Sequence, residues 1–269
     1  MTNRNTFVRT LLAAGATALS ASAMAYPSNN YTNMIPVSEA IAHPAYNANT
    51  GDQNPAGLVY NHGSRILADA QSGNTNLNNI QFGGDFLFGG GTWGGGLGVN
   101  VDPNATGGTS LTGTYGVAAH IQGLSTAIGI GGRTGLSNAS GTTLNLGVLI
   151  APYSPLTVGL TAYGLTGGID GWGGGVGFEL GHNAAFVVDA TTNTKLDTFL
   201  LKPGLWVGNQ KLGLTVSWGF DVGNGAAVPN PISGKDLSIG LNALLGRSIN
   251  WQFCYQSIDK LYTSLTFDL

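Results

Sequence analysis

The stretch Leu261-Tyr-Thr-Ser-Leu-Thr-Phe-Asp-Leu269 alternates between two kinds of side chain. One set of alternate positions is mainly apolar and comprises Leu261, Thr263, Leu265, Phe267 and Leu269. The other set is polar and comprises Tyr262, Ser264, Thr266 and Asp268. Because successive side chains of a β-strand point to opposite faces, this pattern predicts a strand with one apolar and one polar face.

The same alternation recurs through most of the chain. In 212–222 and in 249–256, large apolar residues take every second position, and mostly Gly, Ser, Thr, Asn or Gln stand between them. A water-soluble β-sandwich also alternates, but its outer face carries many charged residues. Here only 9% of residues are charged, whereas about 25% is usual. The pattern therefore favours an all-β fold, a transmembrane antiparallel β-barrel, in which a closed sheet pairs every backbone group inside the bilayer.

The alternating runs predict about fourteen strands, with twelve also possible. Bacterial barrels have even strand numbers, and fourteen fits that rule. The runs are 64–72, 79–89, 92–101, 110–120, 124–134, 142–151, 156–164, 170–180, 184–192, 198–207, 211–222, 236–246, 249–257 and 261–269. We therefore expect residues 64–269 to form the barrel.

Composition excludes several other classes of protein. After residue 25 no apolar run approaches the roughly 18 residues that a membrane helix requires. The 44 glycines show no three-residue period, so a collagen helix is excluded. Cys254 is the single cysteine, which leaves no internal disulfide. The net charge of −3 gives no basic surface for nucleic acid.

The first 25 residues have the features of a secretory signal peptide. Arg4 and Arg9 precede an apolar stretch, and Ala23-Met24-Ala25 resembles a small-residue cleavage site. Removal of 1–25 would leave a net charge of −5. Export and a barrel together predict the outer membrane of a Gram-negative bacterium. The expected partners are outer-membrane lipid and, through the C-terminal strand, the barrel assembly machinery.

The parity of the strands places a small number of ionisable residues on the inner face of the barrel. They are Arg65, Asp69, Asp85, His120, Arg133, Glu179, Asp189, Lys202 and Asp221. Wide open porins carry denser charge than this. Two interpretations stay open: the residues pair with one another and hold the barrel together, or they line a path for solute.

Residues 26–63 lack a strand pattern and contain four of the chain's prolines, Pro27, Pro36, Pro44 and Pro55. The segment is too irregular to face lipid and too long for a simple lead-in, so we expect it to fold into the barrel as a plug. At its end Pro55 fixes φ and Gly57 permits a tight reversal into the first strand. A generic turn before a strand is the alternative.

The residues Asp52-Gln53-Asn54-Pro55-Ala56-Gly57-Leu58 carry a resemblance to a known family. They resemble the D-x-NPAGL signature of the FadL-type transporters of long-chain fatty acids and other hydrophobic compounds. In that family the signature ends an N-terminal hatch that plugs a fourteen-stranded barrel. The resemblance implies passive uptake of hydrophobic small molecules, with Asn54, Pro55, Ala56, Gly57 and Leu58 as the hatch motif.

The resemblance also implies a route out of the barrel. In the family, the ligand leaves through a gap beside a kinked third strand. Here the third run contains Gly94, Gly95 and Gly96, where pairing could be weakened. The same glycines could instead make room for the plug. Family members also have long outer loops that form a first ligand groove, for which this chain has no room.

We expect no enzyme activity and no cofactor. The sequence has no Gly-x-Ser-x-Gly elbow, and Gly234-Lys235 lacks the other residues of a phosphate-binding loop. His43, His62, His120 and His182 are scattered without metal-ligand spacing. We therefore predict no catalytic residue and no metal site. The alternatives to a hydrophobic-compound transporter are a small general-diffusion porin and a sealed structural barrel.

Overall fold

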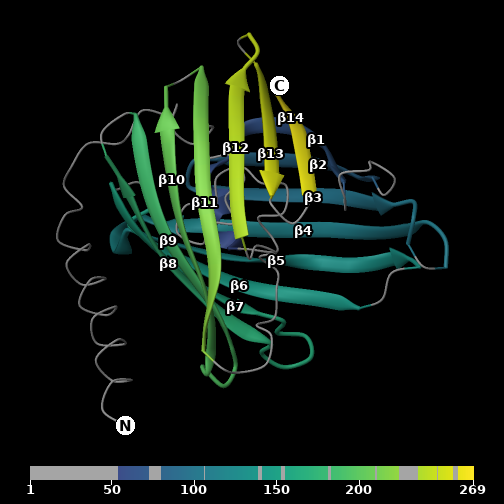
Figure 1. The fold of residues 1–269 in the computed structure, drawn as a ribbon, viewed down its shortest axis with the longest axis horizontal. Helices are drawn as coiled ribbons and strands as arrows, with labels where there is room; N and C mark the ends of the chain where they lie inside the picture. The colour runs from purple at the N-terminus through teal and green to yellow at the C-terminus, as the bar shows by residue number, and fades with distance from the viewer. Residues whose placement is uncertain are drawn as a thin grey trace.

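The chain forms a closed antiparallel β-barrel of fourteen strands in the computed structural model (Figure 1). The structure describes residues 54–72, 80–105, 107–138, 141–152, 155–180, 183–209, 211–223, 236–246, 248–256 and 260–269. The predicted fold class and the count of fourteen are confirmed, and twelve is excluded. The predicted signal peptide 1–25 and residues 26–53 of the predicted plug segment 26–63 lie outside the described residues.

The strands begin and end close to the predicted runs. They are β1 His62–Ser72, β2 Ile80–Gly90, β3 Trp93–Asp102, β4 Ser110–Ile121, β5 Thr126–Ser137, β6 Thr142–Ile150, β7 Leu156–Tyr163, β8 Gly171–Glu179, β9 Ala184–Asn193, β10 Thr198–Gly208, β11 Leu212–Gly223, β12 Asp236–Leu244, β13 Ile249–Gln256 and β14 Lys260–Asp268. Two short 3-10 helices accompany them, η1 Pro55–Tyr60 before β1 and η2 Gln122–Leu124 between β4 and β5. In the described residues no helix has the length and apolar character needed to cross a membrane.

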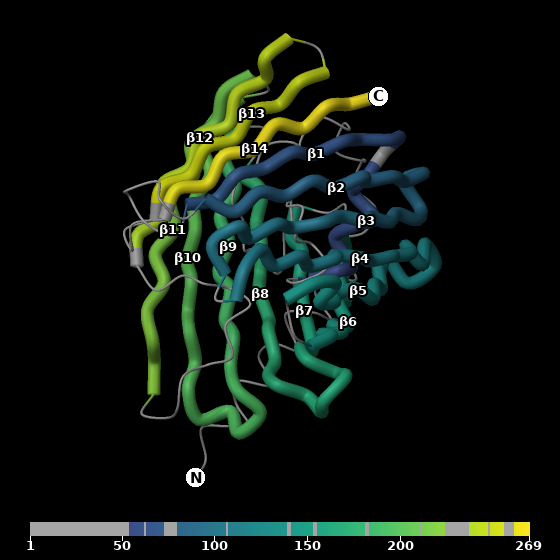
Figure 2. Tube along the Cα trace, turned by 90° about the vertical axis from the view of Figure 1, so that its right-hand side faces the viewer, coloured from purple at the N-terminus to yellow at the C-terminus, as the bar shows by residue number. Residues whose placement is uncertain are grey.

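Each strand pairs with the next in the chain, and β1 pairs with β14 to close the barrel (Figure 2). The closing register runs from Arg65 opposite Asp268 to Ser72 opposite Leu261. At one end of this seam, Arg65 Nε lies 2.7 Å from Asp268 Oδ1. The first and last strands are thus joined by backbone pairing and by an ion pair.

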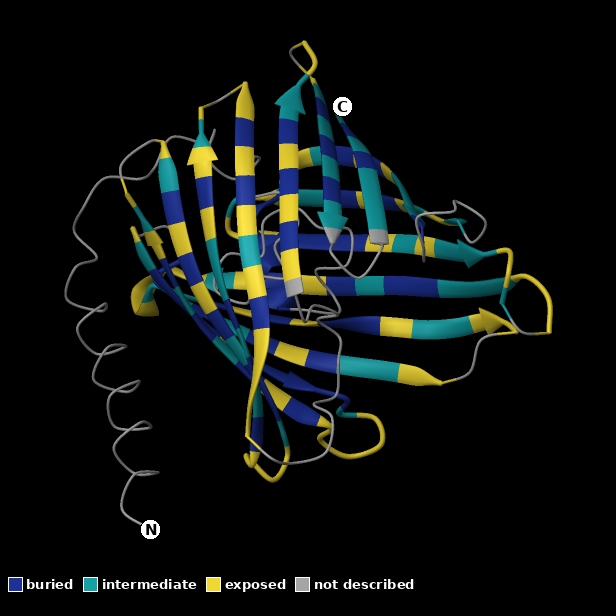
Figure 3. Ribbon diagram, viewed as in Figure 1, coloured by how far each residue is buried: buried dark blue, intermediate teal, exposed yellow. Residues whose placement is uncertain are grey.

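The outer face is apolar and exposed, as the alternation predicts. Along β11 and β12 buried and exposed residues alternate (Figure 3). Leu97 is 61% exposed and Trp218 is 60% exposed. Phe88 packs against Trp93, and Trp218 packs against Phe220, with ring centroids 5.9 Å apart in each pair. Such a surface matches lipid, because the bilayer solvates apolar side chains that water does not.

The two ends of the barrel differ in the length of their connections. We call the end at which β1 begins and β14 ends the terminal rim. At this rim β2 ends at Gly90 and β3 begins at Trp93, and η2 makes another tight turn. At the opposite rim β11 ends at Gly223 and β12 begins only at Asp236. Short turns at one end and longer ones at the other are typical of outer-membrane barrels.

The connection between β9 and β10 is a short turn at the opposite rim. Asn193 Nδ2 donates to Asp197 Oδ1 at 2.6 Å, and Asn193 Oδ1 accepts from Lys195 N at 3.1 Å. The hydrogen bond from Asn193 lowers the pKa of the Asp197 carboxyl below its usual value. The turn is therefore held by its own side chains.

Candidate functional site

The helix η1 is the part of the predicted plug that the structure describes. Its start is specified by Asn54, whose side-chain oxygen accepts from Ala56 N at 3.1 Å. Pro55 follows at the first helical position, where its missing N–H costs nothing. Asn54 O accepts from Gly57 N at 2.9 Å, and Leu58 O accepts from Asn61 N at 3.1 Å. These local bonds make the Asn-Pro-Ala-Gly-Leu motif a compact helical turn.

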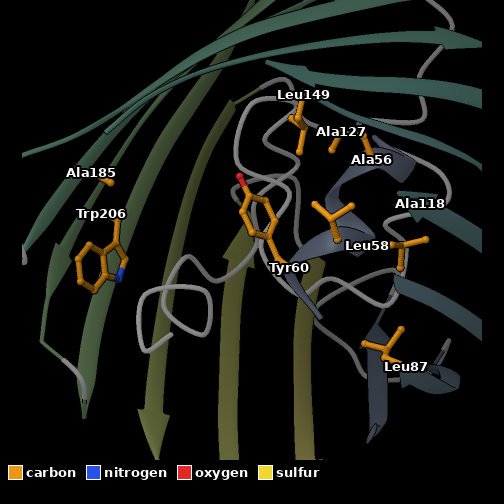
Figure 4. Close-up of a cluster of buried hydrophobic side chains, with 10 residues drawn as sticks. Ala56, Leu58, Tyr60, Leu87, Ala118, Ala127, Leu149, Ala185 and Trp206 are labelled. Atoms are coloured by element: carbon orange, nitrogen blue, oxygen red, sulfur yellow. The ribbon is translucent and has the colours of Figure 1, made fainter. Parts of the chain in front are cut away.

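This turn lies inside the barrel against the inner wall of β2 to β6. All six residues of η1 are buried. Ala56, Leu58 and Tyr60 belong to one hydrophobic cluster with wall residues that include Ala118 and Leu149 (Figure 4). The motif is therefore packed like a piece of core, although it precedes the first strand.

A row of small residues on the wall makes this close packing possible. In the register of β6, β5, β4, β3 and β2, the residues directly opposite one another are Gly147, Gly129, Ala118, Gly94 and Gly89. We call these five residues the small-residue row. It crosses five neighbouring strands near the terminal rim without a large side chain.

The backbone of the motif lies directly on this row. A Cβ added to Gly94 would come closer than 3.0 Å to Leu58 O, and one added to Gly129 would come equally close to the Pro55 carbonyl. At Gly147 an added Cβ would collide with Asn54 Oδ1. These contacts are with backbone or with the capping amide, which cannot simply swing away. Larger residues at these three positions are therefore incompatible with η1 in its present place.

A second row of glycines receives the side chain of Leu58. Gly96, Gly116 and Gly131 stand opposite one another on β3, β4 and β5. A Cβ added to Gly116 would lie 2.7 Å from Leu58 Cδ1, and one added to Gly96 would lie 3.6 Å from Cδ2. Leu58 is only 2% exposed. The wall thus provides a fitted apolar seat for the last residue of the motif.

Polar anchors tie both ends of η1 to β6 and to the turn after it. Asn54 Nδ2 donates to Val148 O at 3.3 Å. Tyr60 Oη donates to Pro152 O at 2.6 Å. Pro152 lies between β6 and β7 at the terminal rim. The turn is therefore oriented by hydrogen bonds as well as by shape.

The three consecutive glycines of β3 lie on both faces of the wall: two face inward and one faces outward. Gly94 and Gly96 face η1, whereas a Cβ on Gly95 would meet the Phe88 ring. The pairing of β3 with β2 and β4 continues through all three residues without a register shift. Gly94 and Gly96 therefore make room for the plug segment. A lateral opening at this strand stays a prediction.

The ionisable residues predicted for the inner face are spread along the wall and do not form one cluster. Arg65, Asp85, Asp189 and Lys202 are buried. Lys202 stands directly opposite Asp189 in the register of β9 and β10. Asp85 Oδ1 accepts from Thr114 Oγ1 at 2.9 Å. Arg65 has its ion pair with Asp268.

The other predicted inner residues are less buried. Asp69, His120 and Glu179 are half-buried, and Arg133 and Asp221 are exposed. Among the residues that the structure describes, no group of three or more His, Cys, Asp or Glu side chains is placed to hold a metal ion.

Trp206 is an inner-wall residue that the sequence analysis missed. It lies on β10 with the parity of Leu200 and Lys202 and is 4% exposed. Most large aromatic residues in the described strands face outward, so the sequence pattern did not distinguish Trp206 as an inward-facing one. Its parity with Lys202 within one strand was the available signal.

Comparison with solved structures identifies the kind of barrel. No protein-family model and no curated protein sequence matches the chain. The toluene transporter TodX of Pseudomonas putida is similar with a TM-score of 0.54 at 10% identity, covering 90% of this chain and 96% of TodX. A TodX mutant described as a monoaromatic hydrocarbon channel gives a TM-score of 0.56 at 8% identity, covering 87% and 96%. The fold is that of outer-membrane barrels.

The outer membrane protein Omp33 of Acinetobacter baumannii is also similar. Its TM-score is 0.51 at 12% identity, covering 78% of this chain and 99% of Omp33. Identities this low show a shared fold and nothing finer. The FadL-type resemblance therefore rests on the Asn54–Leu58 motif and on where that motif lies.

Proposed function

We propose that the protein is an outer-membrane channel for passive uptake of hydrophobic small molecules, such as fatty acids or aromatic hydrocarbons, and that η1 is the end of a hatch. The observation that carries this proposal is the seat of the Asn54–Leu58 motif on the small-residue row. A turn that only leads into β1 needs no matching row of four glycines and one alanine across five other strands.

The seat has the strength expected of a part that can be released. Burial of a side chain such as Leu58 contributes about 1.5–3 kcal/mol. Each neutral hydrogen bond, such as those to Val148 O and Pro152 O, adds about 0.5–1.5 kcal/mol. A ligand that favours the displaced state by a few kcal/mol can shift such an equilibrium.

The chemistry of the solute is proposed from two independent indications. The D-x-NPAGL resemblance implies hydrophobic ligands. TodX, whose fold this chain shares, is described as a toluene transporter. In addition, some of the few ionisable groups on the inner wall already interact with other protein groups. Arg65, for example, forms an ion pair with Asp268. A wall of this kind suits weakly polar solutes better than ions.

The experiment displaces the hatch by filling its seat. Gly94→Val and Gly129→Val place side chains where Leu58 O and the Pro55 carbonyl now lie. Gly84→Val is the matched control, because Gly84 is on β2 and the nearest atom to its added Cβ is 3.8 Å away. Single-channel conductance in planar bilayers is measured for all of them, together with toluene uptake by bacterial cells that carry each protein in a lipopolysaccharide-covered outer membrane, which resists apolar solutes.

We expect the native protein and Gly84→Val to be closed to ions and to admit toluene. Gly94→Val and Gly129→Val should conduct steadily. Equal open conductance in all proteins would identify a general-diffusion porin. Absence of both conductance and uptake in all proteins would identify a sealed structural barrel.

A further inference from the structure

The inner wall opposite the hatch carries buried polar groups that have no hydrogen-bond partner among the described residues. Trp206 on β10, Asn242 on β12 and Gln252 on β13 are 4%, 2% and 3% exposed. Trp206 Nε1, Asn242 Oδ1 and Gln252 Nε2 have no hydrogen-bond partner among the described residues. The hydroxyls of Thr215, opposite Trp206, and of Ser264, opposite Gln252, are also unpaired among the described residues. Buried donors and acceptors are almost always paired, so a group of unpaired ones in one region points to a ligand or solvent.

Trp206, Asn242 and Gln252 lie close together across neighbouring strands. Asn242 stands opposite Gly213 on β11 and opposite Gln252 on β13. A Cβ added to Gly213 would come closer than 3.0 Å to both Trp206 Nε1 and Asn242 Oδ1. The indole N–H and the amide oxygen are thus less than two hydrogen-bond lengths apart. Gly213 leaves the space between them free of a side chain.

The group also lies at the level of the hatch. Trp206 is two residues before the end of β10, and Gly213 is one residue after the start of β11, both at the terminal rim. The small-residue row is near the same rim on β2 to β6. Figure 4 shows Trp206 on a strand across the barrel from Leu58 and Tyr60. A solute that passes a displaced hatch would meet this part of the wall.

We propose that Trp206, Asn242 and Gln252 form a subsite for the neutral hydroxyl group of a phenol or alcohol. A hydroxyl oxygen accepts from the indole N–H and donates its own proton to an amide oxygen. Whichever way the amides of Asn242 and Gln252 are turned, each offers both a donor and an acceptor. The inference rests on the proposed function and names one class among its substrates that the wall would hold more tightly: hydrophobic molecules that carry one hydroxyl.

The three side chains are neutral. A neutral hydroxyl therefore finds both a donor and an acceptor among them. Lys202 is the cation on the same strand as Trp206: it stands opposite Asp189, and its charge also acts on Cys254, two residues after Gln252 on β13.

The test compares two ligands that differ only in the hydroxyl. Binding of p-cresol and toluene to the full-length protein in deuterated detergent is measured by ligand-observed NMR titration, with empty micelles subtracted. Trp206→Phe and Gln252→Leu remove donors from the subsite. Trp218→Phe is the matched control on the lipid face, where Trp218 is 60% exposed.

We expect the native protein to prefer p-cresol over toluene. Trp206→Phe and Gln252→Leu should each weaken p-cresol binding about threefold to tenfold and leave toluene binding unchanged. Trp218→Phe should leave the binding of both ligands unchanged. Equal native affinities would overturn the proposal, because the groups would then hold solvent alone. An equal loss for both ligands in Trp206→Phe would overturn it as well. Toluene uptake by bacterial cells with a lipopolysaccharide-covered outer membrane reports on the channel separately, so uptake without a hydroxyl preference would reject the subsite and retain the transport function.

Discussion

At the scale of single residues, Asn54 combines two tasks with one amide group. Its oxygen caps η1 through Ala56 N, and its nitrogen donates to Val148 O on β6. The first contact makes the turn, and the second fixes the turn to the wall. A residue that could do only one of them would lose either the cap of η1 or the hydrogen bond from Asn54 to β6.

Asn54→Ala should therefore loosen the hatch without opening the sheet. Loss of a helix cap costs about 0.5–2 kcal/mol, so the closed state should become roughly threefold to thirtyfold less favoured. Bursts of single-channel conductance should become more frequent, while the heat-modifiable migration of the barrel on gels stays the same. Asn104→Ala, in a turn at the opposite rim, is the control. Native-like closure of Asn54→Ala would mean that the cap has no part in gating.

The sequence identified the motif residues and, in Gly94 and Gly96, one strand that makes room for them, but not the rest of the wall that receives them. Asn54-Pro55-Ala56-Gly57-Leu58 is recognisable because proline, glycine and a capping residue specify a turn locally. The partners Gly129 and Gly147 are far away in the chain and look like any other strand glycines. Trp206 was missed for a related reason, since the inward or outward position of one aromatic residue becomes notable only when its neighbours across the sheet are known.

At the scale of elements, alternation specified the strands well. The predicted run 142–151 became β6 Thr142–Ile150, and 211–222 became β11 Leu212–Gly223. The sequence could not supply the register between strands, because a period of two is compatible with many relative shifts. The small-residue row and the pairing of Lys202 with Asp189 both depend on that register.

The seam between β1 and β14 gives a prediction at this scale. Asp268→Asn removes the charge that faces Arg65 Nε at 2.7 Å and leaves a buried guanidinium with a weaker partner. We expect the barrel to unfold at a lower temperature, measured by loss of β-sheet circular dichroism in detergent. Asp170→Asn, in the exposed turn between β7 and β8, should leave the transition unchanged. Equal transitions for both variants would show that backbone pairing alone secures the seam.

At the scale of the whole molecule, the closed wall and the seated turn are separable parts. The barrel completes its own hydrogen bonding through fourteen antiparallel pairings, including β1 with β14. η1 adds none of these pairings and covers the inner wall of β2 to β6 near the terminal rim. The wall can therefore stay intact while η1 leaves its seat, which is what a gated channel requires.

The central claim is that η1 must leave this seat for a solute to pass, and a reversible cross-link tests it most directly. Ala56 in η1 and Ala127 in β5 are both fully buried in the same cluster, where Figure 4 shows them next to each other. Ala56→Cys with Ala127→Cys, in a Cys254→Ser background, is therefore the pair chosen to join the turn to the wall, and formation of the disulfide is checked first by mass spectrometry. Toluene uptake is then measured in bacterial cells that carry the protein in a lipopolysaccharide-covered outer membrane, which resists apolar solutes, under oxidising and reducing conditions and with each single cysteine as a control. We predict that oxidation abolishes uptake in the double variant alone and that reduction restores it. Full uptake with the disulfide formed would contradict the account and make η1 a fixed part of the wall.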